Sequence, residues 1–283
     1  MRRCPTLVTA LCLASVVSSV FAGPWTRKQG TGFVQLGFST IGYNKVYNDR
    51  SEKQPLSVDV RDNVLQLLGE YGFTDHLTAS AAVPFKFLSV DGTTASRTNS
   101  GVGDIDLGLK YNWLNANGFV LSSEALFGLP VGSTTNTDGL RLGDGEFNVT
   151  ARMLAGKSFF PTPLYVSADL GFNFRTNNFS HDVPFNIEAG YGLLDNRLYV
   201  ILLIAGRESL SNKATLGSNP SAAELSAAGL GLYGNNLEFL AIVPKVFFRI
   251  DERWAIAASY ATAVHGRNVA GGIVLAGGIA HEF

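Results

Sequence analysis

The chain has 283 residues, of which 46% are hydrophobic and only 16% are charged. This apolar and aromatic content excludes an intrinsically disordered chain, because disordered chains have too little apolar surface to bury. With 22 basic and 23 acidic side chains, the chain also lacks the positive charge excess of proteins that bind nucleic acids through a basic surface.

The first 22 residues have the pattern of a cleavable signal peptide. Arg2 and Arg3 precede an apolar stretch at 7–20, and Val20 and Ala22 provide the small side chains that signal peptidase requires. An apolar stretch of this length is shorter than the roughly 20 residues of a membrane-spanning helix. We therefore predict cleavage after Ala22 and a single exported domain at 23–283.

Both cysteines of the chain, Cys4 and Cys12, lie in this predicted signal peptide. The exported domain would therefore contain no cysteine, which excludes disulfide bonds, thiol catalysis and cysteine metal sites.

The exported domain shows the alternation of a transmembrane β-barrel. No stretch after residue 22 reaches 18 apolar residues without a charge, so a spanning helix is excluded, and closed barrels are the other structure that satisfies the backbone in lipid. In residues 103–113, Ile105, Leu107 and Leu109 share one face with Tyr111 and Trp113, while polar residues and glycine occupy the other. The same period of two occurs at 77–87 and 164–175, and it is typical of strands rather than helices.

The pattern predicts an all-β, antiparallel up-and-down barrel of about twelve strands, an even number as expected of bacterial barrels. The predicted strands are 31–45, 59–71, 77–90, 102–114, 119–132, 145–159, 164–178, 183–194, 197–209, 236–250, 253–264 and 269–283. Five connections are short turns. The other set is mostly longer and comprises 46–58, 91–101, 133–144, 179–182, 210–235 and 265–268, with a short helix considered at 221–230.

Three stretches resemble the outer-membrane family named for the MetA pathway of phenol degradation, which is related to transporters of fatty acids and aromatic hydrocarbons. The stretches are Glu-Tyr-Gly-Phe-Thr-Asp-His-Leu at 70–77, Ser-Gly-Val-Gly-Asp-Ile-Asp-Leu-Gly-Leu-Lys-Tyr at 100–111, and Gly-Leu-Pro-Val-Gly at 128–132 with Leu-Gly-Asp-Gly at 142–145. His76 and Val131 stand where the family usually has Arg and Thr. The resemblance implies a channel for small hydrophobic or aromatic compounds, by analogy at the level of the fold.

One departure concerns the plug of the related fatty-acid transporters, which have fourteen strands and a sizeable N-terminal plug. Here only residues 23–30 precede the first predicted strand. A plug-dependent uptake mechanism is therefore not implied, and we expect any plug to come from the loops or the lumen.

The end of the chain and the aromatic residues near the turns favour the outer membrane of a Gram-negative bacterium over a soluble secreted β-sandwich. Phe283 closes an alternating final strand and resembles the recognition signal of the barrel assembly machinery. Tyr71, Trp113, Tyr191 and Trp254 lie near turns, as in the aromatic girdles of barrels. The expected partners are the lipid bilayer, the assembly machinery and small apolar solutes, with no nucleic acid, no cofactor and a monomeric state.

The polar face of each strand predicts the residues that line the lumen. The predicted acids are Glu70, Asp104, Asp106, Glu124, Glu146, Asp169 and Glu188, and the predicted bases are Lys86, Lys110, Arg152, Arg175, Arg207, Lys245 and Arg249. Seven of each argues against strong selectivity for anions or cations. These charges either form a salt-bridge network that fills a small barrel, or in part line a narrow path gated by loops 133–144 and 210–235.

Other functions receive less support from the sequence. Ser180, His181 and Asp182 have the composition of a lipase triad, but neighbouring side chains on a loop point apart, so we predict no catalytic residue and no enzyme. Asp138, Asp144 and Glu146 could gather calcium, yet a Gly- and Asp-rich outer loop is usually only solvated, and we predict no metal site. A structural or accessory barrel serving surface polysaccharide or adhesion remains the competing hypothesis.

Overall fold

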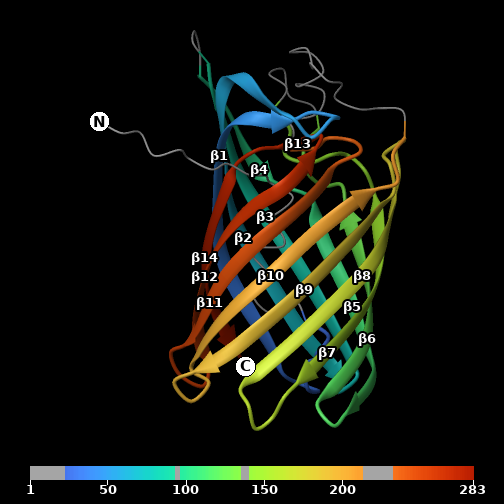
Figure 1. Cartoon of the computed structure of the whole chain (residues 1–283), viewed down its shortest axis with the longest axis vertical. Coiled ribbons are helices and arrows are strands. Elements are labelled where there is room, and N and C mark those ends of the chain that lie inside the picture. Colours follow the sequence, from blue (N-terminus) through green and yellow to red (C-terminus); the bar gives the residue numbers. More distant parts are fainter. Residues whose placement is uncertain (1–22, 93–95, 135–139, 213–231) are drawn as a thin grey trace.

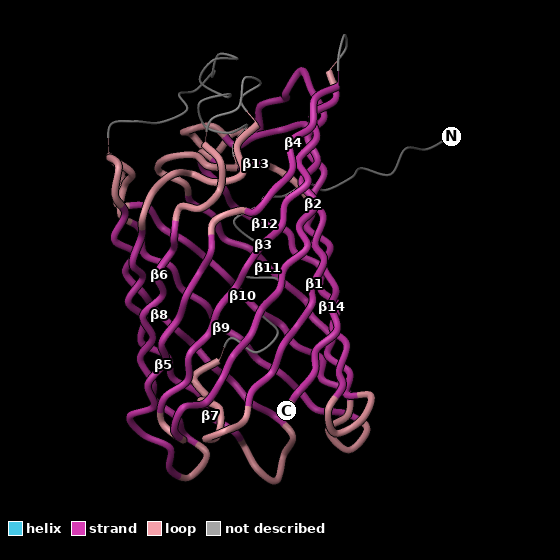
Figure 2. Tube along the Cα trace, turned by 180° about the vertical axis from the view of Figure 1, so that it is seen from behind, coloured by secondary structure: helices cyan, strands magenta, loops and turns pink. Residues whose placement is uncertain are grey.

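The computed structural model describes residues 23–92, 96–134, 140–212 and 232–283. The predicted signal peptide and the helix considered at 221–230 lie outside this part of the chain. The described residues form a closed antiparallel β-barrel with strands that run obliquely around its axis (Figures 1 and 2). Across these ranges there is no helix with the length and apolar character needed to cross a membrane.

In the described ranges, fourteen strands make up the sheet. They are β1 (Gly32–Tyr47), β2 (Lys53–Thr74), β3 (Leu77–Asp91), β4 (Ser96–Val102), β5 (Ile105–Ala116), β6 (Phe119–Leu129), β7 (Asn148–Ser158), β8 (Leu164–Arg175), β9 (Asp182–Leu193), β10 (Leu198–Ser209), β11 (Glu238–Arg249), β12 (Trp254–Arg267), β13 (Val269–Ala270) and β14 (Ile273–Glu282).

The predicted number of twelve barrel strands is confirmed, because two short strands continue longer ones. Both β4 and β5 pair with β3, and together they form one barrel strand that bends at Gly103 and Asp104. The bend lies opposite Pro84 on β3. Pro84 has no N–H to donate to the ladder, and only its carbonyl is bonded there, by the Gly103 N–H. In the same way β13 and β14 both pair with β1, and β1 closes the barrel by pairing with β2 as well.

The outer surface follows the predicted alternation. Large apolar side chains such as Leu67, Leu109 and Leu202 lie on the outer surface and are about half exposed. The predicted aromatic residues near the turns also point outward: Tyr71, Trp113, Tyr191 and Trp254 are 41–63% exposed. The exposed apolar band with aromatic residues at its edge is the surface that a bilayer would cover.

The two ends of the barrel differ, as predicted. We call the end with the short turns and residues 23–31 the turn end, and the opposite one the loop end. At the turn end, Asn117 and Gly118 join β5 to β6 with positive φ at both positions, which suits the twist of a two-residue hairpin. In a second turn, Asp251 accepts hydrogen bonds from the backbone N–H groups of Arg253 and Trp254, and these bonds lower the pKa of its carboxyl.

Two of the predicted loops are wrong. Residues 46–58 and 91–101 mostly form strands, because β1 and β2 continue to a short turn at 48–52 and β3 pairs with β4 up to Asp91 and Ser96. These hairpins extend at the loop end, where side chains on both faces of the sheet stay partly exposed. Residues 91–101 lack an apolar face. In 46–58 the few apolar side chains, such as Leu56 and Val58, pack on the loop-end core rather than forming a lipid-facing row, so the barrel pattern did not identify the strands.

The lumen is not polar throughout, in contrast to the expectation that each strand turns a polar face inward. At the loop end, the inner faces of the strands from β10 round through β1 to β3 carry buried apolar side chains, including Ile41, Val60, Leu203 and Val243. These pack with Leu140, Leu232 and Leu237 from the long loops. An apolar core therefore fills one side of the lumen at the loop end, opposite the polar wall of β5 to β9.

Candidate functional site

The barrel encloses a cavity of about 400 Å³. Its lining combines charged and amide side chains, mostly from β5 to β9, with apolar groups such as Leu68, Leu126, Leu203 and Phe239. A volume of this size lies within the range of sites for small organic molecules. We therefore take the cavity as the candidate functional site.

At the turn end, residues 23–31 cross the lumen. Pro24 accepts a hydrogen bond from Ser122 Oγ on β6 (2.5 Å), and the ring of Trp25 packs edge-on against Tyr165 on β8, with 5.5 Å between ring centroids. Two residues later, Arg27 Nε lies 2.9 Å from Glu70 on β2. Because Tyr165 on β8 lies five of the twelve barrel strands from Glu70 on β2, the segment spans most of the width of the barrel.

This N-terminal segment corrects one expectation. The sequence analysis expected any plug to come from the loops or the lumen, whereas residues 23–31, which precede β1, cross the turn end. Gly23 and Pro24 are buried, and Arg27 also reaches Glu282 on β14 and lies over the ring of Phe33. The segment forms a floor to the cavity, although it is far smaller than a domain-sized plug.

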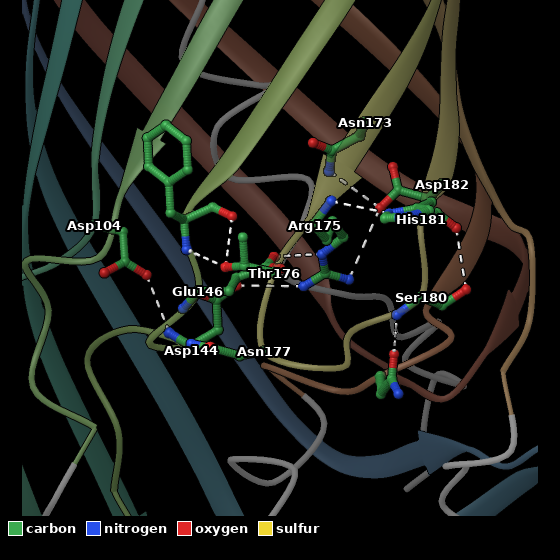
Figure 3. A network of polar contacts seen from close by, with 12 residues as sticks. Asp104, Asp144, Glu146, Asn173, Arg175, Thr176, Asn177, Ser180, His181 and Asp182 are labelled. Atoms are coloured by element: carbon green, nitrogen blue, oxygen red, sulfur yellow. Dashed lines mark hydrogen bonds and ion pairs between the residues drawn. The ribbon is translucent and has the colours of Figure 1, made fainter.

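At the loop end, two loops are fastened to the same corner of the wall. Asp104, in the bend between β4 and β5, accepts hydrogen bonds from the N–H groups of Gly132 (2.9 Å) and Asp144 (3.0 Å), both in loop 130–147. Figure 3 shows the contact with Asp144. On β3, Lys86 Nζ donates to Tyr233 Oη (2.6 Å) from the loop before β11 and lies 2.9 Å from Asp62. At this corner, each loop thus contacts one charged side chain of the wall.

The structure places most of the predicted lumen residues around the cavity. Twelve line it: Glu70, Lys86, Asp104, Asp106, Glu124, Glu146, Arg152, Asp169, Arg175, Glu188, Arg207 and Lys245. Lys110 is buried just behind the lining, with its Nζ 4.0 Å from Glu70 and 3.9 Å from Glu124. Arg249 is exposed at the last position of β11 and lies away from the cavity, because the strand ends there in a turn.

The charge of the lining differs from the balance expected from the sequence. Lys110 and Arg249 do not line the cavity, and Asp144, which was considered only as part of an outer loop, does. The lining residues therefore include eight carboxylates and five basic groups. The sequence signal for Asp144 was the Leu-Gly-Asp-Gly stretch at 142–145. Its inward position depends on the hydrogen bond of its N–H to Asp104, which no local pattern indicates.

On the turn side of the cavity, the charges form a continuous chain of ion pairs around the wall. The chain runs from Arg27 through Glu70, Lys110, Glu124 and Arg152 to Asp169, so that each base lies between two acids or at the end of the series. Nearby, Lys245 Nζ lies 3.0 Å from Glu188, which also accepts a hydrogen bond from Tyr165. Acids and bases compensate one another in this half.

Replacing Arg152 with methionine is expected to lower the stability of the barrel, because it leaves the largely buried carboxylates of Glu124 and Asp169 without their common partner. Breaking a buried ion pair costs about 3–5 kcal/mol, and the adjoining cavity should keep the loss near the lower value. Urea unfolding in detergent measures it. Arg253→Met, which removes an exposed cation at a turn, is the control, and equal midpoints for the two variants would contradict this role of Arg152.

On the loop side, Arg175 is the centre of a second network (Figure 3). Its guanidinium contacts Glu146 directly, and it lies 3.4 Å from Asp144 and 3.8 Å from Asp182. Asp182 is also 3.4 Å from Arg207 and accepts a hydrogen bond from Asn173. On this side, three acidic side chains are paired with only two basic ones.

The structure provides no catalytic triad at residues 180–182. His181 lies outside against Phe172 and Phe174, whereas Asp182 is buried on the inner face, so the two side chains point apart as expected. Ser180 Oγ donates to the His181 carbonyl rather than to its ring.

A different serine, Ser51, lies with its Oγ 3.4 Å from His265 Nε2 on the exposed surface. No carboxylate within the described ranges contacts that imidazole. The same part of the chain holds no group of three or more potential ligands suited to a metal ion.

Comparison with known families gives one match. The profile of the family described as "Putative MetA-pathway of phenol degradation" matches residues 57–273, about three quarters of the chain. No curated protein matches the sequence at a significant level.

Several solved structures share the fold at low sequence identity. The COG4313 outer membrane channel from Pseudomonas putida F1 is 16% identical, with 93% of this chain and 98% of that chain covered and a TM-score of 0.73. The KdgM porin is 8% identical over 88% of this chain and 99% of its own, with a TM-score of 0.50. The translocator domain of the autotransporter NalP from Neisseria meningitidis is 11% identical over 95% and 92%, with a TM-score of 0.51. These likenesses establish the outer-membrane barrel fold.

Proposed function

The chain belongs to the family described as "Putative MetA-pathway of phenol degradation", and from this membership and the central cavity we propose that it is an outer-membrane channel for small hydrophobic or aromatic compounds. The observation that carries the proposal is the cavity itself. It has the volume of a small-molecule site and both apolar and polar walls, and it lies on the axis of a barrel with an apolar outer band.

The two ends of the cavity suggest how passage would be controlled. Residues 23–31 cross the turn end, and loops 130–147 and 232–237 are fastened over the loop end. Because small barrels fill much of their lumen with side chains, a solute would pass only when one or both obstructions shift. Both hypotheses for the lumen charges then apply, each to one half of the cavity. On the turn side the charges form a salt-bridge network that supports the wall, and on the loop side they border the path of the solute.

Orientation, location and assembly belong to the same proposal. Short turns face the periplasm and longer loops face outward in bacterial barrels, so the turn end would be periplasmic. The protein would act as a monomer in the outer membrane of a Gram-negative bacterium. Phe283, exposed beside His281 at the turn end, would serve as the assembly signal.

Uptake of an apolar aromatic dye tests the proposal. We expect cells that produce the protein to take up 1-N-phenylnaphthylamine faster than matched cells that produce an unrelated barrel of similar size. Equal uptake, with the protein shown to be folded in the outer membrane, would instead favour a structural or accessory barrel.

Replacing Asp104 with alanine should release loop 130–147, because it removes the acceptor of two charge-assisted hydrogen bonds from that loop. Such bonds contribute about 1.5–3 kcal/mol each, so the loop-displaced state should become much more populated. Single-channel recording should then show higher mean conductance and more frequent transitions. Asp59→Ala, at an exposed position of β2, is the control, and unchanged traces for Asp104→Ala would argue against this fastening.

A further inference from the structure

The loop side of the cavity carries more acidic than basic side chains. Four carboxylates line this half, Asp104, Asp106, Asp144 and Glu146, and two more, Asp62 and Asp182, are buried at its edge. The basic side chains in this half are Lys86, Arg175 and Arg207. The turn side, in contrast, has a base for each acid.

The bases of the loop side are already engaged with other acids. Lys86 lies 2.9 Å from Asp62, and Arg207 lies 3.4 Å from Asp182. Arg175 contacts Glu146, Asp144 and Asp182. None of the three makes an ion pair with Asp104 or Asp106, so these two carboxylates leave a local excess of negative charge.

Two carboxylates have acceptor positions that the protein does not use. Glu146 is only 2% exposed, and its Oε2 has no hydrogen-bond partner in the described part of the chain. Asp106 lines the same cavity and makes no hydrogen bond or ion pair with a described residue. The buried, unpartnered Oε2 of Glu146 costs free energy, which a donor from a bound molecule would recover. The carboxylate of Asp106 is exposed to the cavity and open to the same donor.

Apolar groups border these acceptors. Pro84, Leu126 and Leu142 line the cavity alongside Asp104 and Asp106. The strand register explains why Leu126 lies near Asp106. Leu126 pairs with Gly108, which is two residues from Asp106 on the same face of β5. The site therefore presents the exposed carboxylate of Asp106 next to an apolar wall, with the unpartnered Oε2 of Glu146 buried beneath the lining.

We propose that the loop side of the cavity binds a small organic cation with an apolar body, such as an arylalkyl- or alkylammonium compound. Its ammonium group, with up to three N–H donors, would occupy the space between Asp106 and Glu146, and its apolar body would pack on Pro84, Leu126 and Leu142. The inference rests on the proposed channel function, since the solute must enter the barrel, and it assigns a preferred charge to that solute.

Calorimetry with three matched probes tests the charge preference. The purified barrel is titrated with 2-phenylethylammonium, the neutral 2-phenylethanol and the anionic 3-phenylpropanoate, which share an aromatic ring and a short chain. We expect the ammonium compound to bind at least about tenfold more tightly than the other two, as expected for a site with unpaired carboxylates.

Variants at Asp106 locate the site. Asp106→Asn keeps the shape but removes the charge, and should weaken binding of the ammonium compound about tenfold while leaving the neutral alcohol unaffected. Asp106→Glu keeps the charge and should retain the preference, which guards against a folding defect in the amide variant. Asp195→Asn, at a turn far from the cavity, is the control.

The outcomes separate this inference from the proposed function. Equal binding of the three probes, or an unchanged affinity in Asp106→Asn, overturns the cation site even when the barrel conducts. Selective ammonium binding by a barrel that neither conducts ions nor speeds dye uptake supports the cation site and overturns the channel.

Discussion

Replacing Leu67 with arginine is expected to prevent stable insertion of the barrel. Leu67 lies on the outer face of β2, is 50% exposed, and stands four residues from the aromatic Tyr71 near the turn end, which places it toward the centre of the apolar band. A charge facing lipid near the bilayer midplane costs about 2–4 kcal/mol. Since folded domains are stable by only about 5–15 kcal/mol, the loss is a large share of the total.

The neighbouring residue provides a matched control. Gln66 points to the opposite face, is 8% exposed and lines the cavity, where acids outnumber bases. Gln66→Arg should therefore fold with nearly unchanged stability. The fraction of folded protein after insertion into lipid vesicles, read from its mobility without heating on a denaturing gel, compares the two. Equal insertion of both variants would mean that the assignment of the faces is wrong.

Loosening the N-terminal segment should open the turn end. In the double variant Trp25→Ala/Arg27→Ala, the segment loses the aromatic contact with Tyr165 and the ion pairs with Glu70 and Glu282. An aromatic pair contributes about 0.5–1.5 kcal/mol and a partly exposed ion pair up to about 1 kcal/mol. Because 1.4 kcal/mol is a factor of ten in an equilibrium, the open state should become about tenfold more populated.

Single-channel recording measures this change as a larger fraction of time at high conductance. Lys28→Ala is the control, because Lys28 lies in the same segment but is exposed. If the double variant and the control have the same conductance distribution, residues 23–31 do not limit passage at the turn end.

The membrane-facing half of the fold was predictable because lipid imposes one simple rule. Every strand that crosses the bilayer needs apolar side chains at every second position, and Ile105 to Trp113 on β5 follow that rule without exception. The number of barrel strands followed from counting such segments. The hairpins at the loop end escaped prediction because, beyond the bilayer, no lipid-facing row is required, and Leu56 and Val58 pack on the loop-end core instead.

The lumen was less predictable because the placement of its side chains depends on contacts with one another, whereas the outer side chains all face the same lipid. Leu203 and Val243 face inward as part of an apolar core that forms only with loop residues such as Leu140, far away in sequence. The inward placement of Asp144 likewise depends on Asp104, forty residues earlier. Such long-range contacts form only when the barrel closes, so no local sequence pattern predicts them.

Two adjacent residues of β8 test whether the cavity is part of a water-accessible path through the barrel. Ser167 lines the cavity, whereas Ala168 is exposed on the outer face. Each is replaced by cysteine, in an exported domain predicted to have none, and ion current is recorded while a charged, membrane-impermeant methanethiosulfonate reagent is added. We expect the reagent to reduce the current through Ser167→Cys and to leave Ala168→Cys unchanged. A current through Ser167→Cys that the reagent does not alter would contradict a path through this cavity.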